Sequence, residues 1–280
     1  MRTAASWSVR AVSVLALAVT PAASASAQEL PADAEAVEAR LESSPRHGEW
    51  VQYDAGSGDS VLAWVVYPER SDPAPVVVVI HEIFGLTDWV RGVADQLAAE
   101  GFIAVAPDLL SGKGPGGGGT ESFESGEVRR AIRELDRGEI VRRLNGAVRY
   151  ATSLPAATSS FASIGFCWGG SVSFMYATAQ PELDAAVVYY GTAPDAEALA
   201  DIEAPVLGLY GGDDARVNAT IGPAEEEMAR LGKFYEYEIY DGAGHGFLRR
   251  QDGRDGANLN AAQNAWPRAV AFLKGQLGDM

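Results

Sequence analysis

Cysteine is almost absent from this chain of 280 residues, which contains only Cys167. A single cysteine cannot form an internal disulfide, so the fold does not depend on disulfide crosslinks. Histidine is scarce as well, with His47, His81 and His245. The lone thiol is an inert core residue, an intermolecular link or a reactive group. The sequence around Cys167 distinguishes these alternatives.

Positive charge is also in short supply. Lys and Arg number 22 against 38 Asp and Glu, which gives a formal net charge of −16. A surface of this sign repels nucleic acid and anionic lipid headgroups, so we expect neither as a partner. Hydrophobic residues make up 47% of the chain, enough for the large core of a globular protein.

Long apolar runs are missing too. The N-terminal stretch AVSVLALAVTPAA, residues 11–23, is shorter than the roughly 20 apolar residues that a membrane-spanning helix needs. Arg2 and Arg10 precede this apolar stretch, and a small-x-small pattern follows it at residues 25–27. These features are typical of a secretory signal peptide over residues 1–27, cleaved before Gln28. We therefore expect a periplasmic or secreted protein without a stable membrane anchor; an uncleaved N-terminal anchor is the alternative.

After a polar extension over residues 28–48, with one short expected helix, strand and helix patterns alternate through a single domain at 49–280. The run at residues 76–80, VVVVI, has no polar position, as in strands buried on both faces. Such alternation predicts an α/β fold with a mostly parallel central sheet and helices on both faces. The glycine-rich stretch 111–122 lacks the spacing of a phosphate loop, and we expect a mobile loop there.

Cys167 lies at the centre of Gly-Phe-Cys-Trp-Gly, between an expected strand and an expected helix. This is the Gly-x-Ser-x-Gly spacing of a nucleophile elbow, with cysteine in the serine position. Gly165 and Gly169 leave room for the sharp turn, and the N-terminus of the following helix favours a thiolate. The pattern therefore favours a reactive thiol over an inert one.

A nucleophile of this kind needs a base and an acid, in the chain order nucleophile, acid, histidine. His245 is the only histidine after Cys167, and it follows an expected strand in a glycine-rich turn. The acid should follow a strand between them, where Asp213 and Asp214 stand side by side. The spacing from Gly211 favours Asp214, with Asp213 as the fallback or as a cap of the turn.

Four short motifs occur in the order seen in the dienelactone hydrolase family, a branch of the α/β-hydrolases with a cysteine nucleophile. They are HEIFGL, GFCWGG, GGDDARV and GAGHGF, which begin at residues 81, 165, 211 and 242. The resemblance covers roughly residues 49–277. It implies an α/β-hydrolase fold and hydrolysis of a carboxylic ester or lactone, with no metal or organic cofactor.

The resemblance also implies roles for individual positions. The residues that match the family's catalytic triad and the two backbone N–H groups of its oxyanion hole are Cys167, Asp214, His245, Ile83 and Trp168. Glu82 matches a glutamate that contacts the resting thiol and helps to form the thiolate; the alternative is an ordinary loop carboxylate.

Substrate binding is where the chain departs from the family. Dienelactone-specific members hold the substrate carboxylate with two arginines, and Arg249, four residues after His245, matches one of them. Gly112 stands at the other position, beside Lys113, which supplies charge but not a bidentate fork. We expect Arg249 and Lys113 to bind substrate, with a plain surface charge as the alternative for Arg249. Whether dienelactone itself is accepted stays open.

These observations lead to one main hypothesis: an exported enzyme that hydrolyses a small-molecule ester or lactone through an acyl-thioester. The alternative from another class is a hydrolase scaffold that binds a ligand, or senses redox state through its thiol, without turnover. A third hypothesis keeps the chemistry and extends the substrate to larger carboxylic esters. The sequence does not predict an oligomeric state.

Overall fold

The computed structural model describes residues 28–124 and 126–278. The predicted signal peptide, residues 1–27, lies outside the described residues. Within the described ranges, no helix is both long enough and apolar enough to cross a membrane.

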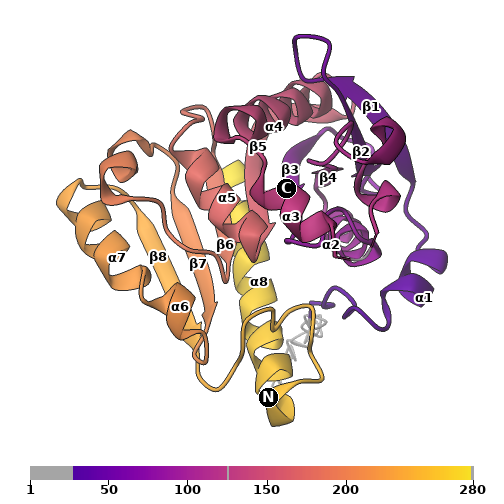
Figure 1. Cartoon of the computed structure of the whole chain (residues 1–280). Coiled ribbons are helices and arrows are strands. Elements are labelled where there is room, and N and C mark those ends of the chain that lie inside the picture. The colour runs from indigo at the N-terminus through magenta and orange to yellow at the C-terminus, as the bar shows by residue number, and fades with distance from the viewer. Residues whose placement is uncertain (1–27, 125, 279–280) are drawn as a thin grey trace, which may run out of the picture.

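The core of the molecule is one sheet of eight strands in the order β1-β2-β4-β3-β5-β6-β7-β8 (Figure 1). The strands are β1 (Gly48–Asp54), β2 (Ser60–Val66), β3 (Ala74–Ile80), β4 (Ile103–Pro107), β5 (Ala157–Phe166), β6 (Ala185–Tyr189), β7 (Val206–Gly211) and β8 (Tyr235–Tyr240). β2 runs antiparallel to β1 and β4, and all other neighbours are parallel. The predicted mostly parallel sheet is confirmed.

Helices cover both faces of this sheet. They are α1 (Val37–Glu42), α2 (Asp88–Ala99), α3 (Val128–Arg133), α4 (Arg137–Thr152), α5 (Trp168–Ala177), α6 (Ala215–Asn218), α7 (Ile221–Arg230) and α8 (Ala257–Leu277). α2 and α8 pack against one face, whereas α4, α5 and α7 pack against the other (Figure 1). Every position of β3 is buried because both of its faces are covered, as its uninterrupted apolar run predicts.

Parallel strands end at the same edge of the sheet, so the loops after β3, β5, β7 and β8 meet there.

The boundary between α3 and α4 differs from the one expected from the sequence. The sequence suggests a hinge near Gly138, but α3 ends at Arg133 and α4 begins at Arg137. The side chain of Asp136 caps α4 by accepting a hydrogen bond from the Glu139 N–H at 3.1 Å. A capping aspartate, rather than the glycine, decides where the helix starts.

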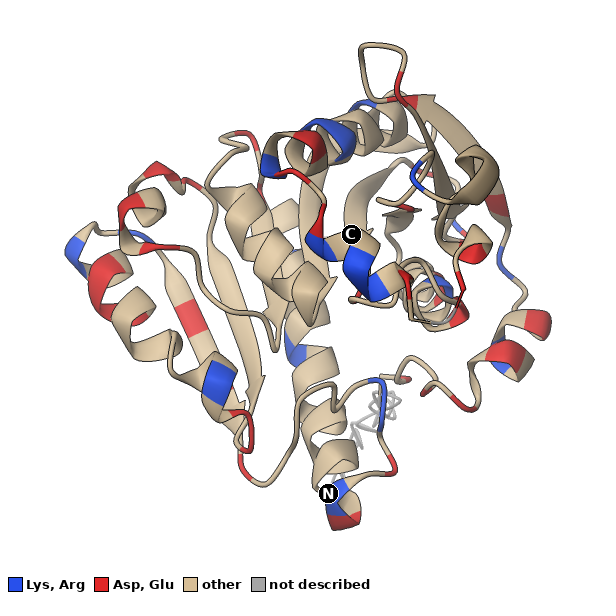
Figure 2. Cartoon of the chain, viewed as in Figure 1, with Lys and Arg blue, Asp and Glu red and all other residues tan. Residues whose placement is uncertain are grey.

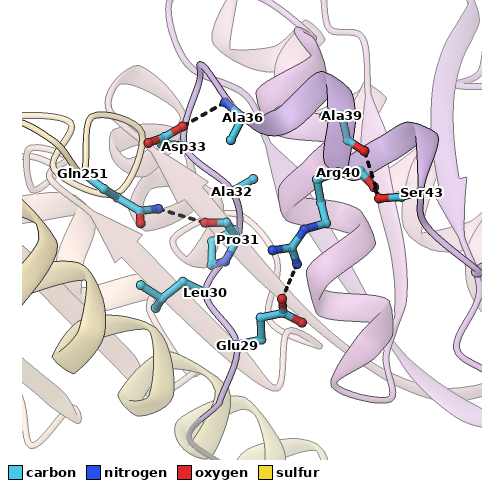
Figure 3. A pocket seen from close by; sticks show the side chains of 10 residues that line it. All are labelled: Glu29, Leu30, Pro31, Ala32, Asp33, Ala36, Ala39, Arg40, Ser43 and Gln251. Atoms are coloured by element: carbon cyan, nitrogen blue, oxygen red, sulfur yellow. Dashed lines mark hydrogen bonds and ion pairs between the residues drawn. The ribbon is translucent and has the colours of Figure 1, made fainter.

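The N-terminal extension is docked on the domain. The Ala34 N–H donates to the carbonyl of Arg249 at 3.0 Å. The side-chain amide of Gln251 donates to the Pro31 carbonyl at 2.8 Å, and Figure 3 shows this side chain pointing toward the extension. The extension and α1 also line a hollow with Gln251. The extension therefore supports the turn that follows β8.

The glycine-rich stretch 111–122, expected to be a mobile loop, is hydrogen-bonded to residues at the edge of the sheet. Asp108, just after β4, is 1% exposed, and its carboxylate accepts hydrogen bonds from both the N–H and the hydroxyl of Thr120. The Thr120 hydroxyl in turn accepts from the Leu86 N–H at 3.1 Å. These long-range bonds, which no local pattern reveals, hold the stretch beside the loop after β3.

Charged residues are dispersed along the chain, and the cartoon in Figure 2 shows acidic residues scattered over helices and loops. Basic residues stand among them, as in the ion pairs of Arg230 with Glu227 and Lys233 with Glu203. Exposed pairs of this kind contribute little to stability, so the fold depends mainly on its apolar core.

Candidate active site

Cys167 occupies a strained turn between β5 and α5. Its backbone angles are φ 57° and ψ −117°, a conformation that residues with a side chain rarely adopt. The Cys167 N–H donates to the Tyr189 carbonyl at 3.0 Å, which anchors the turn to β6. The thiol is thereby held at the N-terminus of α5, at the edge where the strands end.

The two flanking glycines are required by close backbone contacts. A Cβ at Gly165 would overlap the carbonyl oxygen of Gly169. A Cβ at Gly169 would overlap the carbonyl oxygen of Ile80, at the end of β3. Any larger residue would therefore push α5 away from β5 or β3.

His245 and Asp214 meet across the sheet edge. Asp214 follows β7 and is 8% exposed, and His245 lies in the turn after β8. The His245 Nδ1 and an Asp214 Oδ are 2.5 Å apart. Asp213 pairs instead with Arg254, also at 2.5 Å, so Asp214 is the carboxylate that holds the imidazole.

Two neighbours, Asp214 and Cys167, influence the pKa of the His245 imidazole. Burial by itself lowers the pKa of His245, but hydrogen bonding to Asp214 and the nearby Cys167 outweigh it and raise the pKa to about 9. Cys167 is thus close enough to influence the ring, although no hydrogen bond of acceptable geometry joins these two described residues. The arrangement favours a protonated imidazole at this position.

The turn that carries His245 is clamped from α8. Asn258, 4% exposed, accepts from the Gly244 N–H at 2.9 Å and donates to the Arg250 carbonyl at 2.6 Å. One side-chain amide therefore holds both ends of the turn. Sequence reasoning missed Asn258 because the sequence shows it only as a polar residue near the start of a helix.

Glu82 lies directly after β3 and is only 2% exposed. Burial raises the pKa of Glu82 to about 7, against the opposing effect of the positive charges of Arg249 and His245. The Arg249 Nε is 2.8 Å from a Glu82 Oε, an ion pair in which neither atom satisfies hydrogen-bond geometry. The resemblance implies a contact between Glu82 and the resting thiol, whereas this carboxylate is paired with Arg249.

The N–H groups of Ile83 and Trp168 lie on the two segments that meet at the end of β3. Ile83 follows Glu82, and Trp168 is the first residue of α5. Gly169 packs directly on the backbone of Ile80, so the two segments touch. Among the described residues, neither N–H donates a hydrogen bond, which leaves both free for a ligand oxygen.

The family model for the dienelactone hydrolase family matches residues 61–277. The chain belongs to the dienelactone hydrolase family. A Methylorubrum extorquens protein provisionally named carboxymethylenebutenolidase is 32% identical over 229 residues, which span 77% of each chain. A protein of the same provisional name from Yersinia pestis is 30% identical over 228 residues, 77% of this chain and 84% of the relative.

A solved structure gives the same result. The crystal structure of a provisionally named dienelactone hydrolase from Klebsiella pneumoniae superposes with a TM-score of 0.70 at 26% identity, covering 80% of this chain and 98% of that one. The predicted α/β-hydrolase fold and family are confirmed. The protein is a dienelactone hydrolase-like enzyme of the ester and lactone hydrolase class.

The two predicted substrate-binding cations of this dienelactone hydrolase family member have different surroundings. The Lys113 Nζ lies 2.8 Å from a Glu139 carboxylate oxygen on α4. Arg249 lies over the Phe84 ring at 4.7 Å, and Arg129 of α3 lies over the same ring at 4.9 Å. Sequence reasoning missed Arg129 because nothing local connects α3 with the loop after β3.

Tyr190 is another residue that sequence reasoning missed. It follows β6 with φ 39°, is fully buried, and lies edge-on to His245 with ring centroids 5.2 Å apart. Burial raises the pKa of Tyr190 well above 10, so the hydroxyl stays protonated. Its hydroxyl has no hydrogen-bond partner among the described residues. The run VVYYG reads only as a buried strand.

The described residues contain no group of three or more His, Cys, Asp or Glu arranged to hold a metal ion. What they bring together is a thiol, an imidazole paired with a carboxylate, and two free N–H groups. This set is suited to acyl transfer through a covalent intermediate.

Proposed function

We propose that this protein hydrolyses a small carboxylic ester or lactone through a triad of Cys167, Asp214 and His245. The observation that carries the proposal is the strained turn of Cys167, which presents the thiol at the start of α5 beside an imidazole held by Asp214. A strained turn persists only where the surrounding structure enforces it, and such turns cluster at active sites.

Acylation is the first half of the reaction. Glu82 or His245 takes the thiol proton, and the thiolate attacks the substrate carbonyl carbon. The carbonyl π electrons move to oxygen, which then accepts hydrogen bonds from the Ile83 and Trp168 N–H groups. When the bond to the leaving oxygen breaks, the imidazolium of His245 protonates that oxygen.

Deacylation restores the thiol. Neutral His245 takes a proton from water, and the resulting hydroxide attacks the thioester carbonyl. The carbon–sulfur bond breaks and the carboxylic product leaves. The thiolate then regains a proton from the group that took it in acylation, Glu82 or His245, which restores the thiol. Asp214 stabilises the cation in both halves and holds the ring in the required tautomer.

A substrate screen tests this proposal. Wild type and the Cys167→Ala variant are compared on neutral lactones, aryl esters and dienelactone, and the acyl group on Cys167 is sought by mass spectrometry after rapid acid quench. We expect turnover by the wild type alone and an adduct at Cys167. Full activity of Cys167→Ala would exclude the thiol as nucleophile, and reversible thiol oxidation without any turnover would favour the redox-sensing alternative.

Dienelactone serves as the informative arm of this screen. Arg249 is the one matching arginine, and it already faces Glu82, while Lys113 faces Glu139. Comparing dienelactone with a neutral lactone in wild type and Arg249→Gln measures how far the guanidinium favours a carboxylate-bearing substrate. A selective loss for dienelactone assigns Arg249 to the substrate carboxylate; equal losses assign it to Glu82.

We also propose that the protein acts outside the cytoplasm, after removal of residues 1–27. The support is the sequence of the leader alone. Cell fractionation and N-terminal sequencing test it, with Ala27→Arg as a variant that should block cleavage. The expected mature N-terminus is Gln28; a cytoplasmic product that retains the leader would contradict the proposal.

A further inference from the structure

His81 is a titratable residue that the steps above leave unused. It is the first residue after β3, and its side chain is completely buried. Both ring nitrogens have partners: Nδ1 lies 2.8 Å from the Glu82 carbonyl oxygen, and the Leu109 N–H donates to Nε2 at 3.3 Å. A buried polar ring with both nitrogens engaged is held in a single orientation.

These two partners determine the tautomer. Because a backbone N–H from Leu109 points at Nε2, that nitrogen must be the acceptor. The proton is then on Nδ1, which donates to the Glu82 carbonyl. Burial lowers the pKa of His81 against the opposing charge of Asp108, in keeping with a neutral ring.

The Glu82 carbonyl matters because it shares a planar peptide unit with the Ile83 N–H. In a trans peptide the C=O and N–H point in opposite directions, so fixing one fixes the other; the described residues contain no cis peptide. The Gly85 N–H also donates to the Glu82 carbonyl at 3.1 Å. The hydrogen bonds from His81 and Gly85 thus together fix the direction of the Ile83 N–H.

The same ring also contacts the second N–H donor. The imidazole of His81 stacks on the indole of Trp168, with centroids 5.5 Å apart and planes 20° apart. Trp168 supplies its N–H from the first position of α5. One side chain therefore touches both segments whose N–H groups are free.

We propose that His81 is a positioning residue that holds the two N–H groups of the oxyanion hole, Ile83 by a hydrogen bond and Trp168 by stacking. This inference rests on the proposed function. A residue that only fills the core would affect folding and every reaction of the thiol alike. A positioning residue affects only reactions in which a carbonyl oxygen gains negative charge.

Two reactions of the same thiol separate these roles. Acylation of Cys167 by p-nitrophenyl acetate passes through an oxyanion, whereas alkylation by iodoacetamide displaces iodide at a saturated carbon and forms none. Three variants divide the contacts: His81→Phe keeps a stacking ring, His81→Asn keeps a donor near the Nδ1 position, and His81→Leu keeps neither. His47→Phe, at an exposed histidine, is the control.

We expect His81→Leu to lower the single-turnover acylation rate by about 100-fold, and the other two variants to lower it less. Alkylation rates should stay within about twofold of wild type, because the thiol and His245 are untouched. Equal losses in acylation and alkylation, or unchanged acylation, would overturn the inference. A wild type that is never acylated at Cys167 would refute the proposed function instead. If His81→Leu does not fold, the ratio of the two rates in His81→Phe and His81→Asn decides.

Discussion

Replacing Glu82 by glutamine should change how stability depends on pH. Burial raises the pKa of this carboxyl from 4.5 to about 7 in the folded protein. The folded state therefore holds the proton more tightly than the unfolded state. The stability linked to that proton is fully present below the unfolded pKa and is lost as pH rises through the folded pKa, in a window from 4.5 to about 7.

The two pKa values set the size of the effect. Each pKa unit corresponds to about 1.4 kcal/mol, so complete titration of Glu82 costs the folded protein about 3 kcal/mol. Glutamine does not titrate and avoids this loss. The free energy of unfolding of Glu82→Gln, relative to wild type, should therefore rise by about 2–3 kcal/mol between about pH 5 and about pH 8. The ion pair with Arg249 forms only when Glu82 is ionised, so its effect is already contained in the folded pKa of about 7.

Urea unfolding followed by tryptophan fluorescence measures this difference at each pH. Titrating groups that do not interact with Glu82 are common to both proteins, so their contributions cancel. The control is Glu134→Gln, which replaces an exposed carboxylate paired with Arg130. Its free energy of unfolding relative to wild type should be the same at each pH. If the Glu82→Gln difference is equally flat from about pH 5 to about pH 8, burial does not hold the proton on Glu82 and the reasoning is refuted.

Three further outcomes test the site. In Asp214→Asn, loss of the hydrogen bond that raises the pKa of His245 to about 9 should move the alkaline limb of the kcat/KM profile to lower pH, and kcat should fall by about 10⁴. Gly165→Ala should destabilise the protein by about 2 kcal/mol or more in urea unfolding, because its Cβ would overlap a backbone carbonyl, whereas Gly222→Ala, which has open surroundings, should cost nothing. Asn258→Ala, which frees both ends of the His245 turn, should lower kcat about tenfold in steady-state assays, with KM little changed.

The parts of the site that the sequence predicts are those at strand ends. Apolar runs and turn residues place Cys167, Asp214 and His245 after the parallel strands β5, β7 and β8, and parallel strands end at one edge. The choice between Asp213 and Asp214 depends on a contact distant in sequence rather than on a strand end. Arg254, 41 residues further along the chain, pairs with Asp213, whereas His245 pairs with Asp214. No spacing rule within GGDDARV contains that information.

The same limit applies wherever a tertiary contact decides. The stretch 111–122 has the composition of a free loop, yet the buried carboxylate of Asp108 fastens it through Thr120. Arg129 reaches Phe84 only because α3 folds back over the loop after β3. Local composition describes the conformations a segment can adopt, and the partner that selects one of them lies elsewhere in the chain.

The balance of charge around the thiol explains why a carboxyl with a pKa of about 7 suits this place. Arg249 and His245 are the cations nearest to Glu82, and a thiolate on Cys167 would compete with Glu82 for the charge of His245. If Glu82 takes the thiol proton, one anion replaces another and the total charge does not change. A group that titrates near neutral pH accepts and releases a proton at little cost in either direction. Burial raises the pKa of Glu82, and the charges of Arg249 and His245 partly offset that rise. In the proposed mechanism, this partial offset suits Glu82 to accept the thiol proton and return it.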